Sequence, residues 1–396
     1  MPKSNSQATE LLIVGGGVIG LSVAWRARCQ GLSVLLLERE SLGQGASHVA
    51  AGMLAPVAEV EFGSSARRVL ELGLRSAAMW PAFARELEEL SSVTVGLRQT
   101  GTLVLARDDD EARELERQSS LRDSLGLRTS RLLSSQAREL EPALAPTLRL
   151  ALESPDDHSV DPRLVIEALC KACQLNGVML REHTAVAAID LDGAGRLRGV
   201  RLHDGEFLRA ERVLIAAGAW SAQLAGLPDD ARAPVHPVKG QILRLRDPAG
   251  AGLLERVVRF QGGYIVPRGD GNYVLGATME ERGFDRSPTA GGVYELLRDA
   301  HELVPGVSEL EVVELGVGLR PGTPDNKPVI GPSSHDGLMW ASGHHRNGIL
   351  LAPLTAELIL AALADGQEPN PLAQACDPMR FGKQHHLQHE VVKAAR

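Results

Sequence analysis

Apolar and polar positions near the start of the chain predict a strand, a glycine turn, a helix and a second strand. Residues 11–14 are a short apolar run, and the turn after it reads G-x-G-x-x-G. Residues 18–29 have apolar side chains at helical spacing, and residues 33–37 are apolar again. Glu38 follows about twenty residues beyond the turn, where dinucleotide-binding units carry an acid. The pattern therefore predicts a dinucleotide-binding βαβ unit.

Each glycine of this turn has its own role in such a unit. Gly15 permits the tight turn, Gly17 lets a pyrophosphate approach the backbone, and Gly20 lets the helix pack closely on the strand. The helix directs its positive N-terminal end at the phosphates. The carboxylate of Glu38 accepts hydrogen bonds from the adenosine ribose. The alternative, an ordinary glycine turn, is disfavoured because strand, helix, second strand and acid all occur in register.

The rest of the chain alternates helical and strand-rich patterns without an internal repeat. Asp161-Pro162 supplies an N-cap and a first-turn proline for one of the helices. The predicted elements in chain order are a Gly/Ala-rich segment at 43–56, helical patterns to residue 90, a hairpin at 96–106 with its tip at 99–101, polar helices to residue 140, a helix at 164–175, a strand meander at 186–208, an apolar strand from 213, a strand-rich block at 238–279 with a hairpin turn at 271–272, a strand at 337–342, a polar turn at 343–348 and a helix at 349–364.

Composition narrows the class of protein. A chain of 396 residues is long enough for two domains, and its net charge of -8 argues against a nucleic-acid surface. No apolar run approaches the length of a membrane span, and residues 1–10 lack the apolar core of a signal peptide. We therefore expect a cytoplasmic protein without membrane insertion. Four cysteines are too few for a disulfide framework, and we expect neither a metal site nor a redox role for Cys170 and Cys173.

The choice between NAD and FAD depends on segments far from the fingerprint. FAD is the longer cofactor and needs glycine-lined backbone at several distant points, which residues 43–54, 216–220 and 343–348 supply. A helix that begins at Gly348 would direct its N-terminus at the isoalloxazine and stabilise the negative charge of reduced flavin. The glycines at 193 and 195 fit a hairpin turn, so the chain has one nucleotide fingerprint. We therefore expect an FAD enzyme that takes electrons directly from its substrate, an oxidase or a dehydrogenase.

Further motifs make the chain resemble a known family. They are GASHVAAGML at 45–54, YIVPR at 264–268, GATM at 276–279, GLRPGT at 318–323 and GHHRNGIL at 343–350. From about residue 11 to about residue 360 the chain resembles the FAD-dependent glycine oxidases of thiamine biosynthesis, within the D-amino-acid oxidase superfamily. The resemblance implies non-covalent FAD, oxidation of glycine to an imine, and reoxidation of the flavin by O2 with release of H2O2. The imine would hydrolyse to glyoxylate and ammonia or enter thiazole formation, and the protein would be a homotetramer.

The resemblance and the glycine pattern together give the expected cofactor contacts. The set comprises Gly15, Gly17, Val18, Ile19, Gly20, Glu38, Arg39, Ala46, Ser47, Ala51, Gly52, Met53, Val186, Gly218, His344, His345, Arg346, Asn347, Gly348, Ile349 and Leu350.

Four residues are candidates for substrate recognition. A small amino acid offers its carboxylate, which arginine binds with two parallel hydrogen bonds, and Arg320 in its Gly/Pro-framed loop is the candidate for that contact. We expect Arg346 close to substrate and flavin, Tyr264 over the substrate, and Met279 in the pocket wall. The alternatives are a surface arginine, a structural arginine that caps carbonyls, a core tyrosine and a packing methionine.

No general base is required for hydride transfer from a neutral amine, because orientation and charge placement suffice. We therefore expect supporting roles for His344 and His345, and structural roles for His48 and His158. One departure from the family concerns the position two residues before the tyrosine, where glycine oxidases can carry a histidine and this chain has Gly262. The preference among glycine, sarcosine, N-ethylglycine, D-alanine and D-proline stays open.

The expected fold class is α/β, with a Rossmann-type FAD-binding domain interleaved with an α+β substrate domain on a mixed, largely antiparallel sheet. The FAD-binding domain comprises residues 1–80, 150–225 and 320–380, and the substrate domain comprises residues 81–149 and 226–319, followed by a tail at 381–396. Two rival functions remain open. One is a dehydrogenase that passes electrons to a quinone or a protein, and the other is a non-catalytic flavin-binding sensor.

Overall fold

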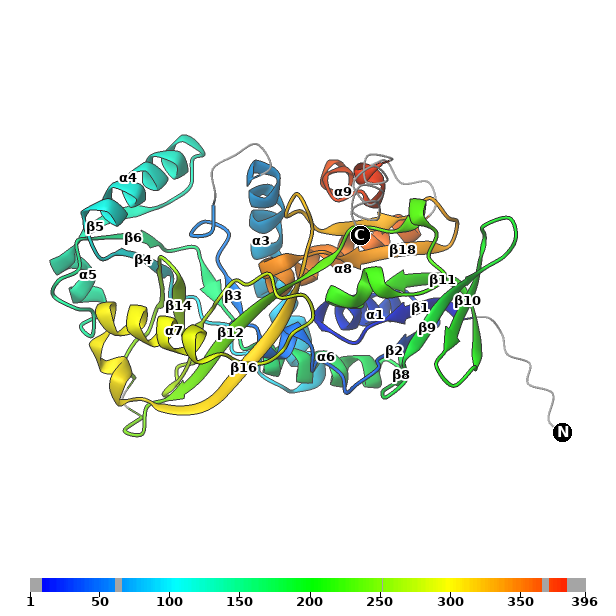
Figure 1. Ribbon diagram of the computed structural model, residues 1–396, viewed down its shortest axis with the longest axis horizontal. Coiled ribbons are helices and arrows are strands. Elements are labelled where there is room, and N and C mark those ends of the chain that lie inside the picture. Colours follow the sequence, from blue (N-terminus) through cyan, green and yellow to red (C-terminus); the bar gives the residue numbers. More distant parts are fainter. Residues whose placement is uncertain (1–8, 61–65, 251, 365–369, 383–396) are drawn as a thin grey trace, which may run out of the picture.

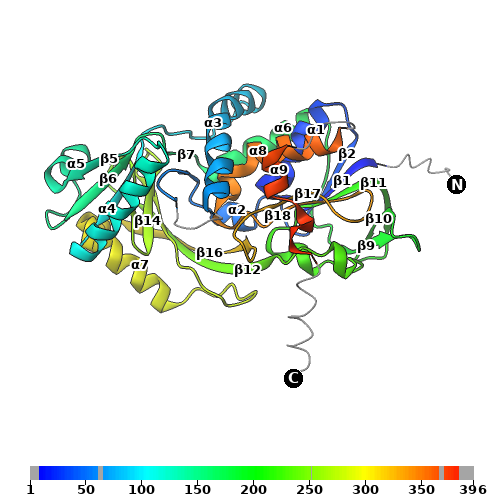
Figure 2. The ribbon, with the colours of Figure 1, turned by 90° about the horizontal axis from the view of Figure 1, so that it is seen from above.

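The computed structural model describes residues 9–60, 66–250, 252–364 and 370–382. In these residues two eight-stranded sheets lie side by side, each with its own helices (Figures 1 and 2). The first sheet contains the predicted βαβ unit, and the second is mixed and largely antiparallel. The predicted fold class is therefore confirmed.

The first sheet runs in the order β17-β18-β11-β1-β2-β8, and β10 and β9 extend it from β11. Strand β1 lies at its centre, parallel to both β2 and β11. Its apolar side chains are buried on both faces, as expected for parallel strands between packed layers. The strands are β1 (Thr9–Val14), β2 (Val34–Leu37), β8 (Met179–Arg181), β9 (Val186–Leu191), β10 (Leu197–Leu202), β11 (Phe207–Ile215), β17 (Val329–Pro332) and β18 (Leu338–Ser342).

Apolar helices gather on one face of this sheet (Figure 2). Phe83 of α3 meets the indole rings of Trp25 and Trp80 edge-on at 5.4 and 5.3 Å, which joins α3 to α1. The stretch His345–Leu363 is long and apolar enough to cross a membrane, but most of it is buried as the core helix of this layer. The helices are α1 (Val18–Cys29), α2 (Ala46–Val49), α3 (Ala66–Ser91), α6 (Pro162–Leu175), α8 (Gly348–Leu363) and α9 (Pro371–Ala375), and the short strands β3 (Met53–Leu54) and β7 (His158–Ser159) pair beside them.

The second sheet runs in the order β16-β12-β15-β14-β13-β4-β6-β5. Its two longest strands, β12 and β16, are antiparallel neighbours that reach toward the first sheet (Figure 1). The strands are β4 (Thr102–Ala106), β5 (Ser130–Leu133), β6 (Leu150–Ser154), β12 (His236–Arg246), β13 (Val257–Phe260), β14 (Gly263–Pro267), β15 (Asn272–Gly276) and β16 (Glu311–Gly322), and the helices beside them are α4 (Asp109–Ser124), α5 (Ser134–Leu140) and α7 (Ala290–Leu303).

Most predicted elements are present. Helix α1 has the predicted bounds, and the helix predicted at 164–175 begins at Pro162, with the Asp161 side chain accepting a hydrogen bond from the Arg163 backbone N–H. The meander at 186–208 is confirmed as β9, β10 and the start of β11. The turn at 271–272 joins β14 and β15.

The predicted hairpin at 96–106 is wrong. Its second half is β4, which pairs with β6 on one side and with β13 on the other. In its first half, Arg98 pairs with Ser159 instead. Leu103 and Leu105 are buried, so the apolar run is an interior strand whose partners come from distant parts of the chain.

Candidate active site

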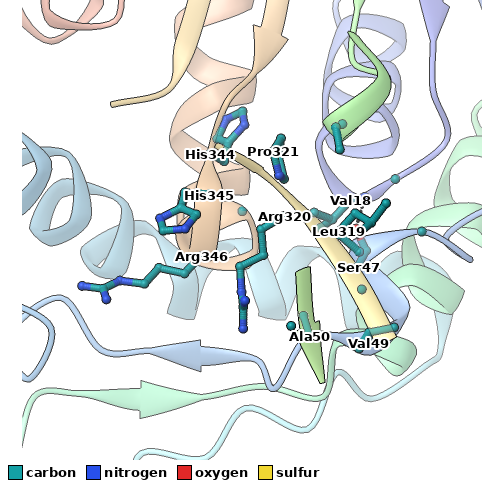
Figure 3. Close-up of a pocket in the computed structure, with 18 of the residues that line it drawn as sticks. Val18, Ser47, Val49, Ala50, Leu319, Arg320, Pro321, His344, His345 and Arg346 are labelled. Carbon is teal, nitrogen blue, oxygen red and sulfur yellow. Dashed lines mark hydrogen bonds between the residues drawn. The ribbon is translucent and has the colours of Figure 1, made fainter. Parts of the chain in front are cut away.

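One continuous cavity of about 1080 Å³ runs from the glycine turn of the first sheet to the long strands of the second. Its nucleotide end lies where β1 meets α1, and its other end lies beside β12, β14 and β16. Figure 3 shows Arg320 of β16 and Arg346 of the turn before α8 extending in different directions near this second end. The cavity is therefore long, with the glycine turn at one end and Arg320 and Arg346 near the other.

The glycines at the nucleotide end leave backbone where side chains would collide. Gly15 has φ +114°, and a Cβ there would lie 2.7 Å from the carbonyl carbon of Ala216. A Cβ on Gly20 would collide with the Gly15 carbonyl oxygen, whereas one on Gly17 would meet only the Ser47 hydroxyl, at 3.4 Å. The first two glycines therefore allow strand, turn and helix to approach, and Gly17 leaves the helix end open to a ligand.

The acid at the end of β2 is held in place by backbone groups. Glu38 accepts hydrogen bonds from the N–H groups of Gly16 (2.7 Å) and Glu40 (2.9 Å). Beside it the Arg39 guanidinium lies 3.8 Å above the Trp220 ring, a cation–π distance. These groups line the cavity where the fingerprint places an adenosine ribose.

The turn before α8 also lines the cavity, and its two histidines are neutral. His344 is buried and shares a hydrogen bond with the Thr355 hydroxyl (2.9 Å), and burial lowers its pKa to about 3. Burial also lowers the pKa of His345 to about 4, and the charges of Arg320 and Arg346 act in the same direction. Both imidazoles are therefore uncharged at neutral pH, which fits supporting roles.

The arginine predicted to bind a carboxylate lies across the second sheet. Arg320 Nη1 donates to the carbonyl oxygens of Thr278 (3.0 Å) and Lys239 (3.4 Å). Burial raises the pKa of the nearby Tyr264 hydroxyl, and the Arg320 charge opposes that rise. Met279 also lines the cavity, but 61% of its surface is exposed, so it lies at the rim.

Sequence reasoning missed an acid and a third arginine at this end. Glu59 forms ion pairs with Arg346 Nε (3.1 Å) and Arg259 Nη2 (3.6 Å). Burial raises the pKa of Glu59, but Arg346 and Arg259 outweigh it, so the pKa lies below its usual value and the carboxylate is charged. Glu59 follows the motif at 45–54 by only five residues, and Arg259 interrupts the apolar strand β13. These two sequence positions could have indicated that both residues belong to the site.

Buried groups fix the segment that carries Glu59. Asp157 accepts hydrogen bonds from the backbone N–H groups of Val57 (3.0 Å) and Ala58 (2.6 Å). Arg122, which is fully buried, donates to the carbonyl oxygens of the same two residues, both at 2.9 Å. The backbone N–H groups and carbonyl oxygens of Val57 and Ala58 are thus all hydrogen-bonded, which gives the Glu59 side chain a defined position.

Comparison with known proteins identifies the family. Residues 10–362 match the family described as FAD dependent oxidoreductase (DAO). The chain belongs to this family. It is therefore an FAD-dependent oxidoreductase, and the cavity described above fits the elongated cofactor.

Relatives and solved structures agree with this assignment. The flavoenzyme is 38% identical to the glycine oxidase of Geobacillus kaustophilus, over 91% of this chain and 93% of that protein. It is 36% identical to the bifunctional protein ThiO/ThiG of Synechocystis sp., of which it spans about half, 54%. The crystal structure of the Geobacillus kaustophilus enzyme superposes with a TM-score of 0.85 (36% identity, 93% of this chain and 98% of that chain). That of iminodiacetate oxidase from Chelativorans sp. BNC1 gives 0.84 (28% identity, 93% and 99%).

The predicted site residues of this flavoenzyme come together in space. Every predicted cofactor and substrate residue lines the one cavity except Gly20, which packs against Gly15. His48 and His158 are not among the lining residues. In the described part of the chain no group of three or more His, Cys, Asp or Glu is placed to hold a metal ion.

Proposed function

We propose that this FAD-dependent oxidoreductase oxidises glycine and related small primary and secondary amines to imines, with O2 reduced to H2O2. The observation that carries the proposal is the Arg320 guanidinium beside Tyr264 in the same cavity as the turn at 343–348. A guanidinium in a buried site binds a carboxylate with two parallel hydrogen bonds. The relatives named glycine oxidase support the choice of substrate.

Each group at this end of the cavity has a task in that reaction. Arg320 binds the substrate carboxylate, and the Tyr264 hydroxyl lies over the substrate. Bound FAD would supply the acceptor for the hydride that leaves the α-carbon of the neutral amine, and O2 would serve as the final oxidant. The first turn of α8, which begins at Gly348 and has no side-chain cap, would direct its backbone N–H groups and positive dipole end at negative charge on the cofactor. The released imine hydrolyses to glyoxylate and ammonia.

Anaerobic reduction of the flavin tests the proposal directly. Glycine, sarcosine, N-ethylglycine, D-alanine and D-proline are mixed in turn with the oxidised holoenzyme, and bleaching of the flavin absorbance is followed before air is admitted. Gly262, with φ +93°, lines the cavity edge, so the order of preference in this panel reports how much space that edge leaves. If none of the amines bleaches the flavin, the sensor alternative gains support and the proposed function is wrong.

The Arg320→Ala variant tests the carboxylate contact. It should bind FAD normally but lose roughly 2–5 kcal/mol of substrate recognition in kcat/KM, the range measured for unpairing a buried charge. A variant with unchanged kcat/KM would contradict the assignment. Peroxide formed in equal amount to substrate consumed distinguishes an oxidase from a dehydrogenase that requires a quinone or protein acceptor.

We also propose a wider setting for the enzyme. The match to ThiO/ThiG proteins supports a role in supplying the imine for thiazole formation in thiamine biosynthesis. Four free cysteines support a cytoplasmic location. A homotetramer is proposed by resemblance, and exposed Val312, Val313 and Leu315 on the edge strand β16 support association, which light scattering tests.

The domain division stays part of this proposal. The FAD-binding domain would comprise residues 1–80, 150–225 and 320–380, and every strand of the first sheet falls within those ranges. Limited proteolysis with and without FAD tests it, because cofactor binding should protect these segments first.

A further inference from the structure

Two glycines inside strands of the second sheet lie where the substrate-binding side chains rest. Gly240 is in the middle of β12, and Gly276 ends the neighbouring strand β15. Neither has a positive φ, so their backbone conformations do not require glycine. Glycine within a strand weakens it and commonly marks a place where another group approaches the backbone closely. The presence of glycine at these two positions must therefore be explained by the atoms that pack against them.

That reason is visible in what a side chain would meet. A Cβ on Gly240 would lie 2.5 Å from both Cζ and Nη2 of Arg320, and closer still to Nη1. Because three atoms of the guanidinium are involved, the group lies flat across the strand at this residue. A Cβ on Gly276 would lie 2.8 Å from the Tyr264 hydroxyl oxygen. The two glycines thus provide the space that the guanidinium and the phenol occupy.

The surrounding hydrogen bonds hold the guanidinium over Gly240. Its Nη1 donates to the carbonyl oxygen of Lys239, the preceding residue of the strand, and to that of Thr278. Arg320 is opposite Val238 in the register of β12 and β16, so its side chain runs along the sheet to reach Gly240. One edge of the planar group is anchored to backbone carbonyls, and the donors that remain can face a carboxylate in the cavity.

We propose that Gly240 is a positioning residue for substrate recognition, because its lack of a side chain allows the Arg320 guanidinium to lie at the depth where it binds the substrate carboxylate. The inference deepens the proposed function and rests on it. An ordinary contact distance from a methyl group is about 3.4 Å or more, so alanine at this position moves the guanidinium by about 1 Å toward the cavity. A displacement of about 1 Å costs on the order of 100-fold in catalysis.

The test compares Gly240→Ala with Gly316→Ala. Gly316 is also a strand glycine of this sheet, but a Cβ there meets Ile242 and Val49 rather than Arg320, and Gly316 does not line the cavity. Gly240→Ala should keep FAD content and raise the KM for glycine on the order of 100-fold, with a smaller change in kcat. Acetate, as a probe for the carboxylate contact, should bind to this variant correspondingly more weakly in calorimetric titration. Gly316→Ala, whose added methyl group meets Ile242 and Val49 instead of the guanidinium, should change the KM much less than Gly240→Ala.

A double variant separates a positioning role from a structural one. In the Arg320→Ala background Gly240→Ala should have no further effect on KM or on acetate binding, because the group that it displaces is absent. If Gly240→Ala alone fails to fold, the double variant should fold, since the colliding guanidinium has been removed. An unchanged KM in Gly240→Ala, a full additional loss in the double variant, or a double variant that also fails to fold would each overturn the proposal.

Failure of the proposed function has a different signature. In that case the wild-type enzyme is not reduced by any amine in the panel, whereas acetate binding still responds to Gly240→Ala if the guanidinium is displaced. The two conclusions are therefore tested by separate measurements on the same proteins.

Discussion

Replacing Glu59 with glutamine keeps the size of the side chain and removes the charge that lies between Arg346 and Arg259. The ion-pair distances are 3.1 and 3.6 Å, and the carboxylate side chain is 12% exposed. At an effective dielectric constant of about 20, each contact corresponds to about 5 kcal/mol of gross attraction. Loss of the buried carboxylate also removes its desolvation cost, so the net change is much smaller. Because both arginines stay partly exposed, we expect a loss of about 2–3 kcal/mol in the free energy of unfolding, near the lower end of the range for breaking buried pairs.

The measurement is urea unfolding of the FAD-loaded enzyme, with Glu357→Gln as the matched control. Glu357 pairs with Arg75 at 3.4 Å, but both side chains are about half exposed, so its loss should cost less than about 1 kcal/mol. The pKa of Glu59 lies below its usual value, so the carboxylate is charged throughout pH 6–9. The difference between Glu59→Gln and wild type should therefore be constant across that range.

The same variant should change ligand binding. With Glu59 neutral, the net charge of this end of the cavity is more positive by one, and acetate should bind more tightly than it binds wild type. Equal stability losses in Glu59→Gln and Glu357→Gln, together with unchanged acetate affinity, would refute the argument that Glu59 neutralises the cavity arginines.

Two further predictions concern stability. Burial lowers the folded-state pKa of His344 to about 3, so below about pH 6.5 the unfolded chain binds a proton that the folded chain excludes. The free energy of unfolding should therefore decrease as the pH falls from about 6.5 toward 3. This group contributes at most about 1.4 kcal/mol per pH unit to that decrease. Urea titrations at pH 5 to 8 should show a smaller slope in His344→Gln. Arg122→Met should cost about 3 kcal/mol because it removes two buried hydrogen bonds from a charged donor to the Val57 and Ala58 carbonyls, although Val60 N–H and Arg259 still donate to these oxygens. Arg117→Met, on the exposed side of α4, should cost less than about 1 kcal/mol. Equal melting temperatures for these two arginine variants would contradict this account of the segment.

The nucleotide end could be predicted because its information is local. The turn, the helix and the acid of the βαβ unit lie within 28 residues of sequence from Leu11 to Glu38, and each has one role that its residue type reveals. The hairpin at 96–106 was wrong for the opposite reason. Strand β4 pairs with β13, which begins more than a hundred residues later, and the Gln-Thr-Gly turn predicted at 99–101 does not reveal such a partner.

The substrate end combines groups that have no local signal for one another. Glu59 and Arg346 are 287 residues apart, and no sequence pattern around either residue predicts that they are in contact. Likewise, Gly240 reads in sequence as an interruption of a strand, and its relation to Arg320 appears only when β12 and β16 pair. The family motifs pointed to Arg320 and Tyr264 because each lies within a short motif that can be recognised from the sequence. The contacts of Glu59 and Gly240 with the arginines of this cavity are visible only in the fold.

Substitutions at the nucleotide end and at the substrate end of the cavity should have different effects. Gly15 and Gly20 of the fingerprint meet backbone atoms, so side chains at these two positions would displace the strand and helix that hold FAD. At the other end, Gly240 meets the far end of an arginine side chain, which can move while the backbone stays in place. Substitutions around β12 and β16 should therefore alter which carboxylate is bound, and how deeply, while the cofactor stays bound. Specificity in this fold can vary with little cost to the nucleotide end, because Gly240 and Arg320 belong to the second sheet and the glycine turn belongs to the first.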